Sequence, residues 1–304
     1  MSRVATLPTQ TALVTALGRS QASVAEANVQ LSSFKKVQDY AGLAGSTRRV
    51  LSAATLQAQL QAQSDVAKRV GTTLSFYDFS LTDLDSGMAD LKKKLLSAIG
   101  EGNGNGIDQA IQEAFTGLRT ALNATEAGVP LFAGGQTGTL PFVPQTLGDL
   151  TKLGSPAAAF ANDDTRVSAR IEGDTDLSYG ITASELGSGL VKAFQTLAGL
   201  GSFSKTMTKA QIDGLNTAMA QIDEGVGPLR TISGRNGDLR NHVDTVLARA
   251  QDRITLLSEV IGDGVDADLK QVATDLSIRT TILNASYAAF TKLNGMSLVD
   301  YLRP

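Results

Sequence analysis

Hydrophobic residues recur with helical spacing near the start of the chain. Between Thr9 and Phe34, steps of four and three residues alternate along one seam, which consists of Leu13, Leu17, Ser20, Val24, Ala27, Leu31 and Phe34. This is the spacing of a coiled coil, with one polar step at the serine. Arg19 and Glu26 are the only charged residues between Val4 and Ser33. A surface helix carries more charge on its outer side, so we expect this helix to bury more than one face.

The C-terminal stretch has the same character, with two apolar faces. One seam contains Val272, Leu276, Leu283 and Phe290, and a second face contains Ile278, Ile282, Ala285 and Ala289. A single helix of this kind is more often packed into its own domain, but here both ends of the chain share the property. We therefore expect the two terminal helices to pair with each other and then with neighbouring subunits.

Helical patterns also fill most of the chain between its ends. Residues 47–97 predict one long helix, the glycine- and asparagine-rich residues 101–106 predict a turn, and a shorter helix follows it. In the second half, a seam from Ile212 to Leu229 precedes another from Leu239 to Leu257. Gly227–Pro228 predicts a bend or an end between these two seams, because proline lacks the amide that a helix interior needs.

The composition changes in the middle of the chain. Residues 128–201 hold four of the seven prolines. Polar and apolar residues alternate from Arg166 to Ile171, which predicts a half-buried strand, and residues 177–181 are its expected hairpin partner across Gly173–Asp174. The whole pattern predicts a mainly α fold: a long antiparallel helical hairpin with coiled-coil termini and a small β-containing insert at its midpoint.

The same pattern predicts three domains. Residues 1–40 together with 265–304 form a terminal coiled-coil domain in this interpretation. Residues 41–130 together with 202–264 form a helical rod domain, and residues 131–201 form the insert domain. Aromatic residues make up only 5% of the chain and tryptophan is absent, which is typical of long helices that pack through small and aliphatic side chains.

Charge and cysteine content remove several classes of function. The formal net charge is −3, and the densest basic run, Lys92–Lys94, lies inside an apolar helical pattern, so we expect a solvated face and no nucleic-acid partner. The chain has no cysteine, which excludes disulfides, thiolate metal sites and a cysteine nucleophile. Residues 1–17 do not resemble a secretory signal, and no apolar stretch approaches the roughly 20 residues that span a bilayer.

No group of residues predicts catalysis. His242 is the single histidine, and no acid or serine accompanies it at a motif spacing. The glycine-rich residues 100–106 follow a predicted helix and lack the lysine and serine or threonine of a phosphate-binding loop. We therefore expect a protein that is not an enzyme, with no catalytic residues, no cofactor and no metal site.

Two segments resemble the flagellin superfamily, and in particular its hook-associated proteins. Residues 283–290 (LNASYAAF) and 295–302 (GMSLVDYL) are similar to the ending of the hook-associated proteins that join hook to filament. Residues 131–137 (LFAGGQT), followed by Pro141 and Phe142, are similar to the segment where such a protein leaves its helical domain for the insert. The resemblance covers most of the chain outside residues 142–163.

The segment after the first helix departs from this pattern. Residues 33–37 (SFKKV) keep the basic pair of the family but replace its glycine, and only Asp39 remains of an acidic pair. Residues 39–44 (DYAGLA) are closer to the corresponding loop of flagellin. Two structural roles therefore stay open: a hook–filament junction protein and a filament subunit. A secreted enzyme or binding protein on a helical scaffold is the alternative from another class.

The resemblance implies a structural component of the bacterial flagellum that joins hook to filament through its paired terminal helices. It implies an extracellular location reached without a cleaved signal peptide. The implied partners are flagellin, other hook-associated proteins, further copies in a ring and an export chaperone, with no nucleic acid and no membrane. The residues expected at the assembly interface are Leu13, Leu17, Val24, Leu31, Leu276, Leu283, Tyr287, Phe290, Leu298 and Tyr301.

Overall fold

The computed structural model describes residues 6–39 and 41–301, and these are mainly helical, as the sequence predicts. The chain divides into two compact units. The terminal unit combines the two ends of the chain, up to Gln59 and from Arg253 onwards, and the central unit comprises residues 60–252. The division into three domains stays a prediction.

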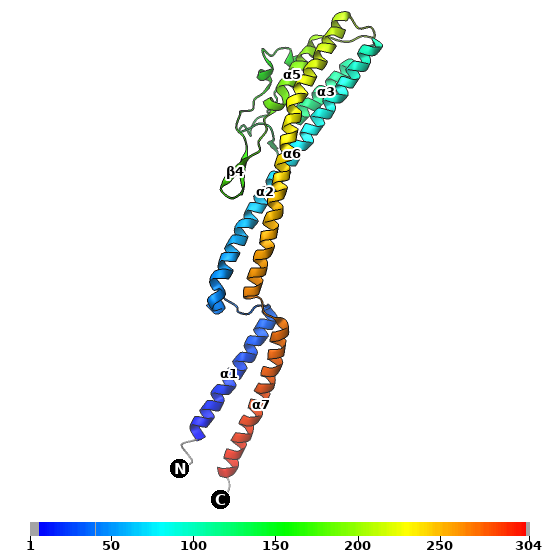
Figure 1. Cartoon of the computed structure of the whole chain (residues 1–304). Coiled ribbons are helices and arrows are strands. Elements are labelled where there is room, and N and C mark those ends of the chain that lie inside the picture. The colour runs from blue at the N-terminus through cyan, green and yellow to red at the C-terminus, as the bar shows by residue number, and fades with distance from the viewer. Residues whose placement is uncertain (1–5, 40, 302–304) are drawn as a thin grey trace. The chain divides into compact units, whose positions relative to one another are not determined.

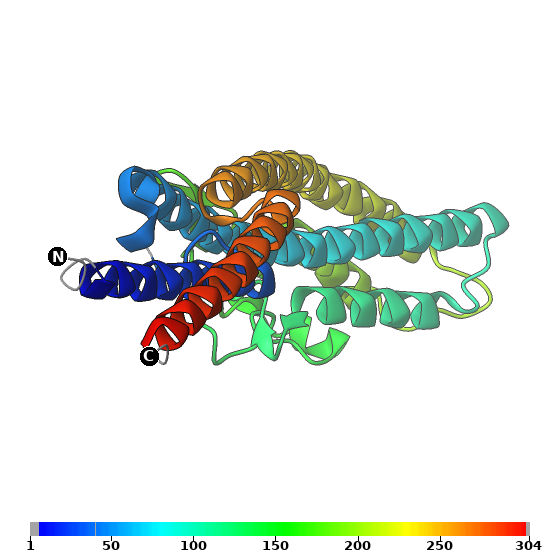
Figure 2. The ribbon, with the colours of Figure 1, turned by 90° about the horizontal axis from the view of Figure 1, so that it is seen from below.

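The terminal unit is built on two paired helices. Helix α1 (Thr6–Ser33) and helix α7 (Leu269–Tyr301) lie side by side (Figures 1 and 2), which confirms the predicted pairing of the termini. A short 3-10 helix, η1 (Ala41–Ser46), leads into helix α2 (Thr47–Glu101), and helix α6 (Lys209–Val265) ends in this unit. Gln57 on α2 donates a hydrogen bond of 2.6 Å to the Ser258 hydroxyl on α6.

Backbone hydrogen bonds join the segment after α1 to the segment before α7. Phe34 has a φ of 61°, in the left-handed region that ends many helices. Its carbonyl oxygen accepts a hydrogen bond of 2.9 Å from the Ala267 amide, and the Lys36 amide donates one of 2.7 Å to the Val265 carbonyl. These bonds hold the two connecting segments together at the end of the helix pair where α1 ends and α7 begins.

In the central unit α2 and α6 run antiparallel. Three ion pairs link them, and residue numbers on α6 fall as those on α2 rise: Arg240–Asp78 at 2.7 Å, Arg230–Asp85 at 2.8 Å and Lys92–Asp223 at 2.5 Å.

Helix α6 continues through Pro228, although the sequence leaves a bend or an end open there. Val226 and Leu229 are buried on either side of the proline. Their packing against the central core offsets the lost backbone hydrogen bond.

Helices α3 (Ile107–Leu122) and α5 (Ala183–Gly199) pack against each other and complete the helical part of the central unit (Figure 1). The helical spacing in the sequence predicts α3 but not α5, which lies inside the expected insert. Thr182 and Glu185 form a capping box at the start of α5. Gly189 of α5 meets Gly225 of α6 so closely that a Cβ on Gly189 would lie 2.7 Å from the Gly225 Cα.

The rest of the insert is irregular apart from one small hairpin, and a second small hairpin directly precedes the insert. Strand β3 (Ser168–Glu172) pairs antiparallel with β4 (Thr175–Ser178) around Gly173, which confirms the predicted hairpin. The two-residue strands β1 (Thr125–Glu126) and β2 (Val129–Pro130) form a second antiparallel pair that the sequence analysis does not predict. Helix α4 (Leu147–Leu150) and the 3-10 helix η2 (Pro156–Ala159) pack on α5.

The central unit has an aromatic core. The ring of Phe115 lies with its centroid 5.9 Å from that of Phe194 and 6.1 Å from that of Phe142. The rings of Tyr77 and Phe132 lie 5.3 Å apart. All five side chains are almost fully buried, and they come from α2, α3, α5 and the segment between α3 and α5.

Candidate assembly interface

The predicted seam residues occupy the paired helices of the terminal unit, but they are only partly covered. Seven of the ten predicted interface side chains are half-buried, namely Leu13, Leu17, Val24 and Leu31 on α1 and Leu276, Leu283 and Phe290 on α7. The residues of α1 and α7 that are buried in the described part are Ala27 and Val272. The helix pair therefore covers its inner face incompletely.

Polar contacts across the pair set its register. Arg279 on α7 donates a hydrogen bond of 2.9 Å to the Ser23 carbonyl on α1. The Gln21 side-chain amide donates to the Tyr287 hydroxyl. Tyr287 itself is 41% exposed, so this predicted interface residue keeps much of its ring available to a further partner.

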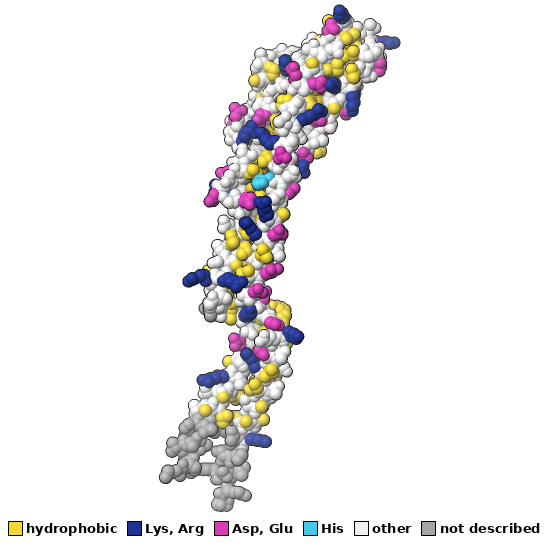
Figure 3. All heavy atoms as spheres, viewed as in Figure 1, with side chains coloured by type: hydrophobic (Ala, Val, Ile, Leu, Met, Phe, Trp, Pro, Cys, Tyr) yellow, Lys and Arg dark blue, Asp and Glu magenta, His cyan; other side chains and the backbone are white. Residues whose placement is uncertain are grey.

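The outer faces of both helices carry exposed aliphatic side chains. Val14 and Val29 on α1 are 55% and 44% exposed, and Ile278 and Ile282 on α7 are 53% and 51% exposed. The two isoleucines belong to the second apolar face that the sequence predicts for the C-terminal helix. Figure 3 shows hydrophobic side chains on the surface of these helices, where charged side chains are sparse. Ile278 and Ile282 lie about one helical turn apart and so share one face of α7.

Leu298 and Tyr301 lie within the last turns of α7, and their side chains are outside the part of the chain whose side chains are described. Their place in the interface stays a prediction. The role of all ten residues in assembly is likewise a prediction, which the position of the other eight on the paired helices supports.

The described residues contain no group of three or more metal-ligating side chains. His242 lies exposed on α6. Within residues 6–39 and 41–301, none of the helices has the length and hydrophobicity to cross a bilayer.

Tyr77 is the group whose ionisation the fold alters most among those described. Burial raises the pKa of Tyr77 to about 12, and its hydroxyl donates a hydrogen bond of 3.3 Å to the Leu131 carbonyl. The phenol therefore stays protonated at neutral pH while it bonds to the backbone. The sequence analysis does not single out this residue, although Val70, Leu74 and Leu81 place it on the seam of α2.

Solved structures with this arrangement of helices exist. One, from Vibrio parahaemolyticus and described as a flagellar hook-associated protein, matches with a TM-score of 0.57 and 17% identity, over 72% of this chain and 96% of its own. FlgL from Bacillus cereus matches with a TM-score of 0.56 and 13% identity, over 70% of this chain and 99% of its own. FlgL from Xanthomonas campestris matches with a TM-score of 0.56 and 12% identity, over 69% and 99%.

The fold is that of the flagellar hook-associated proteins. This confirms the resemblance seen in the sequence at the level of the fold. No protein-family model matches the sequence, and no curated protein matches it either. At 12–17% identity the side chains at most positions differ, so the likeness concerns the course of the backbone.

Proposed function

We propose that this chain is a structural component of the bacterial flagellum that joins hook to filament. The observation that carries the proposal is the hook-associated fold together with a terminal helix pair whose outer faces expose Val14, Val29, Ile278 and Ile282. Copies that dock through these faces remove their apolar surface from water, which drives association. No catalytic or cofactor role is part of this proposal.

The interface of this proposal consists of the ten predicted residues on α1 and α7. Further copies, flagellin and other hook-associated proteins are the proposed partners, and an export chaperone covers the helices beforehand. The proposed location is the extracellular flagellum. The central unit keeps its own aromatic core whether or not the termini are engaged, so it acts as a folded body that the helix pair anchors.

The test removes the terminal helices. A variant without residues 1–34 and without the residues after Val265 should remain folded by circular dichroism but should not support filament attachment in the bacterium that carries it. Cells without the chain should make hooks that bear no filaments in electron micrographs. Filaments that attach normally with the truncated variant would contradict assembly through the termini.

A filament subunit is the second candidate, because residues 39–44 resemble the flagellin loop. The two roles differ in what the purified protein does. A junction protein should form no long filaments alone and should add to preformed flagellin seeds or hooks. Long filaments grown from the purified chain without seeds, seen by electron microscopy, would favour the filament subunit.

A further inference from the structure

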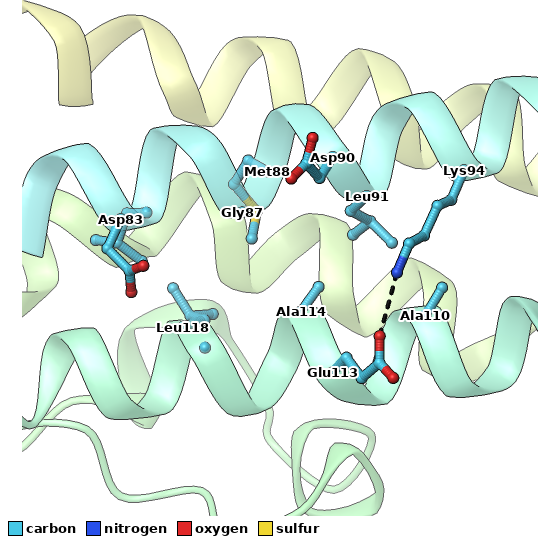
Figure 4. Close-up of a pocket in the computed structure, with 12 residues that line it drawn as sticks. Asp83, Gly87, Met88, Asp90, Leu91, Lys94, Ala110, Glu113, Ala114 and Leu118 are labelled. Atoms are coloured by element: carbon cyan, nitrogen blue, oxygen red, sulfur yellow. Dashed lines mark hydrogen bonds and ion pairs between the residues drawn. The ribbon is translucent and has the colours of Figure 1, made fainter.

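A groove on the central unit has the form of a receptor for one side chain. It lies between α2 and α3 and encloses about 200 Å³. Figure 4 shows Met88, Leu91 and Leu118 along the groove, with Asp83 near one end and Lys94 near the other. Small-molecule sites usually enclose about 300–1,000 Å³, so this groove suits a single apolar side chain better than a free ligand.

Two glycines keep the groove open. Gly87 on α2 and Gly117 on α3 line it, and a Cβ built on either would meet no atom within 4 Å. The backbone is helical at both positions, so the glycines are not needed for an unusual backbone conformation. Glycine in a helix interior costs roughly 0.5–1 kcal/mol relative to alanine. Because neither glycine has a side chain, the groove keeps a space that an incoming side chain can fill.

The charged residues around the groove differ in whether they have an ion-pair partner. Lys94 pairs with Glu113 across its one end at 3.1 Å, and Asp90 pairs with Lys93 at 3.0 Å. Asp83, at the other end, makes no ion pair with any described residue. The groove therefore offers an apolar floor with one unpaired carboxylate about one helical turn from Gly87.

The start of α2 carries the complementary pattern. Leu51 is 52% exposed, and Arg48 precedes it by three residues, so both lie on one face about one turn apart. Arg48 and Arg49 make no ion pair with any described residue and stand in the first turn of a helix with no acidic residue there. Cations at a helix N-terminus are unfavourable, so a carboxylate from outside would stabilise them.

We propose that the groove of one copy receives Leu51 of a second copy, with Arg48 of that copy on Asp83. In each pair the charged residue precedes the apolar position along α2: Asp83 precedes the groove at Gly87, and Arg48 precedes Leu51. The α2 helices of the two copies can therefore lie parallel, with one shifted along the other. Such a contact joins different surfaces of the two copies and repeats from copy to copy. It rests on the proposed structural function and names one contact by which copies recognise each other.

Leu256 is a rival occupant within the chain, because it also follows an arginine by three residues. It is 60% exposed and follows Arg253 by three residues. Asp252 and Glu259 flank it at one helical turn on either side, and they would face the carboxylates of the groove. The stretch from residue 47 to residue 64 has two arginines and no acidic residue. Charge complementarity therefore favours Leu51.

Cysteine cross-linking tests the contact directly, because the chain has no cysteine of its own. In the full-length protein with Leu51→Cys and Gly117→Cys together, oxidation of assembled material should give a ladder of linked oligomers on a non-reducing gel. Each single variant should give no ladder. Thr116→Cys is the matched control for the groove position, since its side chain is exposed on the same helix and does not line the groove. Leu256→Cys replaces Leu51→Cys in the rival pairing.

Charge exchange provides a second measurement. Asp83→Arg or Arg48→Asp alone should weaken assembly about tenfold, and the two together should restore it. Gly117→Leu should block the groove and weaken assembly while it leaves the thermal unfolding of the protein unchanged or raised.

The outcomes separate this contact from the proposed function. Assembly that depends on the terminal helices but shows no ladder, or a ladder equal to that of the Thr116 control, would overturn the contact and leave the function standing. A ladder only with Leu256→Cys would also overturn it. A chain that does not assemble under any condition would overturn both.

Discussion

The central and terminal units bury hydrophobic side chains in different ways. The central unit encloses five aromatic rings and a layer of leucines that are almost fully buried. In the described part of the terminal unit, the buried hydrophobic residues are Ala27, Val50, Ala53, Ile254 and Val272. The larger side chains there are half-buried or exposed. The central unit thus completes its core within one chain, whereas the described terminal unit leaves much of its apolar surface exposed.

This difference concerns where the free energy of burial is gained. Each fully buried large side chain stabilises the folded chain by about 1.5–3 kcal/mol relative to an exposed one. The central unit gains this on folding. In the proposed assembly the terminal helices gain most of it on association, so a substitution there should change assembly more than it changes the folding of the monomer.

The largest difference in the free energy of unfolding is expected between the alanine variants of two phenylalanines, one in each unit. Phe194→Ala removes a ring that is almost fully buried and packs against Phe115, and it should lower the free energy of unfolding by about 3–5 kcal/mol. Phe290→Ala removes a half-buried ring in the terminal unit and should cost the monomer less than about 1 kcal/mol. Chemical denaturation of the two variants measures both values. Equal losses would show that the terminal unit has a core of its own.

A smaller effect should distinguish two glycines on α6. A Cβ at Gly225 would lie 2.8 Å from a Leu190 methyl and 2.9 Å from the Gly189 carbonyl carbon. Gly225→Ala should therefore force α5 and α6 apart and cost about 1–3 kcal/mol.

Gly234→Ala is the matched control for Gly225→Ala. A Cβ there would meet nothing within 4 Å, so this variant should be neutral or stabilise the helix by about 0.5–1 kcal/mol. Thermal unfolding of both variants measures the difference. If the two melt alike, the close approach of α5 and α6 does not constrain the central unit.

The elements that the sequence predicts well are those set by local spacing. The seams of α1, α2, α3 and α7 repeat every three to four residues, and all four segments are helical in the structure. Helix α5 is missed because residues 183–199 lie in a stretch rich in glycine, proline and threonine. The capping pair Thr182 and Glu185 is a signal that would have found it. Pro228 is overestimated as a helix breaker because tertiary packing on both sides outweighs its local cost.

The candidate sites also divide into one that local spacing predicts and one that depends on contacts between distant segments. The apolar faces of the terminal helices follow from periodicity, so all ten expected interface residues lie on the paired helices, and the side chains of eight of them are described. The α2–α3 groove could not be predicted, because Gly87 and Gly117 are 30 residues apart and only the turn between the helices brings them together. The pairing of Asp163 with residues 134–136 is also a contact between distant segments.

Asp163 provides a test by pH within the central unit. Hydrogen bonds from the Gly135 amide at 2.8 Å and the Thr165 amide at 2.9 Å hold the pKa of Asp163 below its usual value. A lowered pKa stabilises the fold above the ordinary carboxyl pKa of about 3.9, and this stabilisation is lost as the pH falls through the folded-state pKa. Asp163→Asn should therefore melt below the parent protein near neutral pH.

The difference between Asp163→Asn and the parent should shrink in acid. Melting curves from about pH 6 to about pH 2.5 follow it. Asp164→Asn is the control, because the side chain of Asp164 is exposed. A difference that stays constant over the whole range would show that the carboxylate charge of Asp163 does not hold the insert against residues 134–136.

The smallest effect on folding, and the sharpest on assembly, is expected at the outer face of α7. Ile278→Asn and Ile282→Asn replace side chains that are 53% and 51% exposed. Each should change the free energy of unfolding of the monomer by no more than about 0.5 kcal/mol. Assembly should weaken strongly, since each copy would place a polar amide in an interface that this face helps to build.

Sedimentation or electron microscopy measures assembly, and denaturation measures folding. Thr280→Asn is the matched control, because Thr280 is exposed on the same helix but lies roughly half a turn around it from both isoleucines. Assembly at the normal level with both isoleucines replaced would place the interface on another face, and the contrast between the two units would then rest on the inner seam alone.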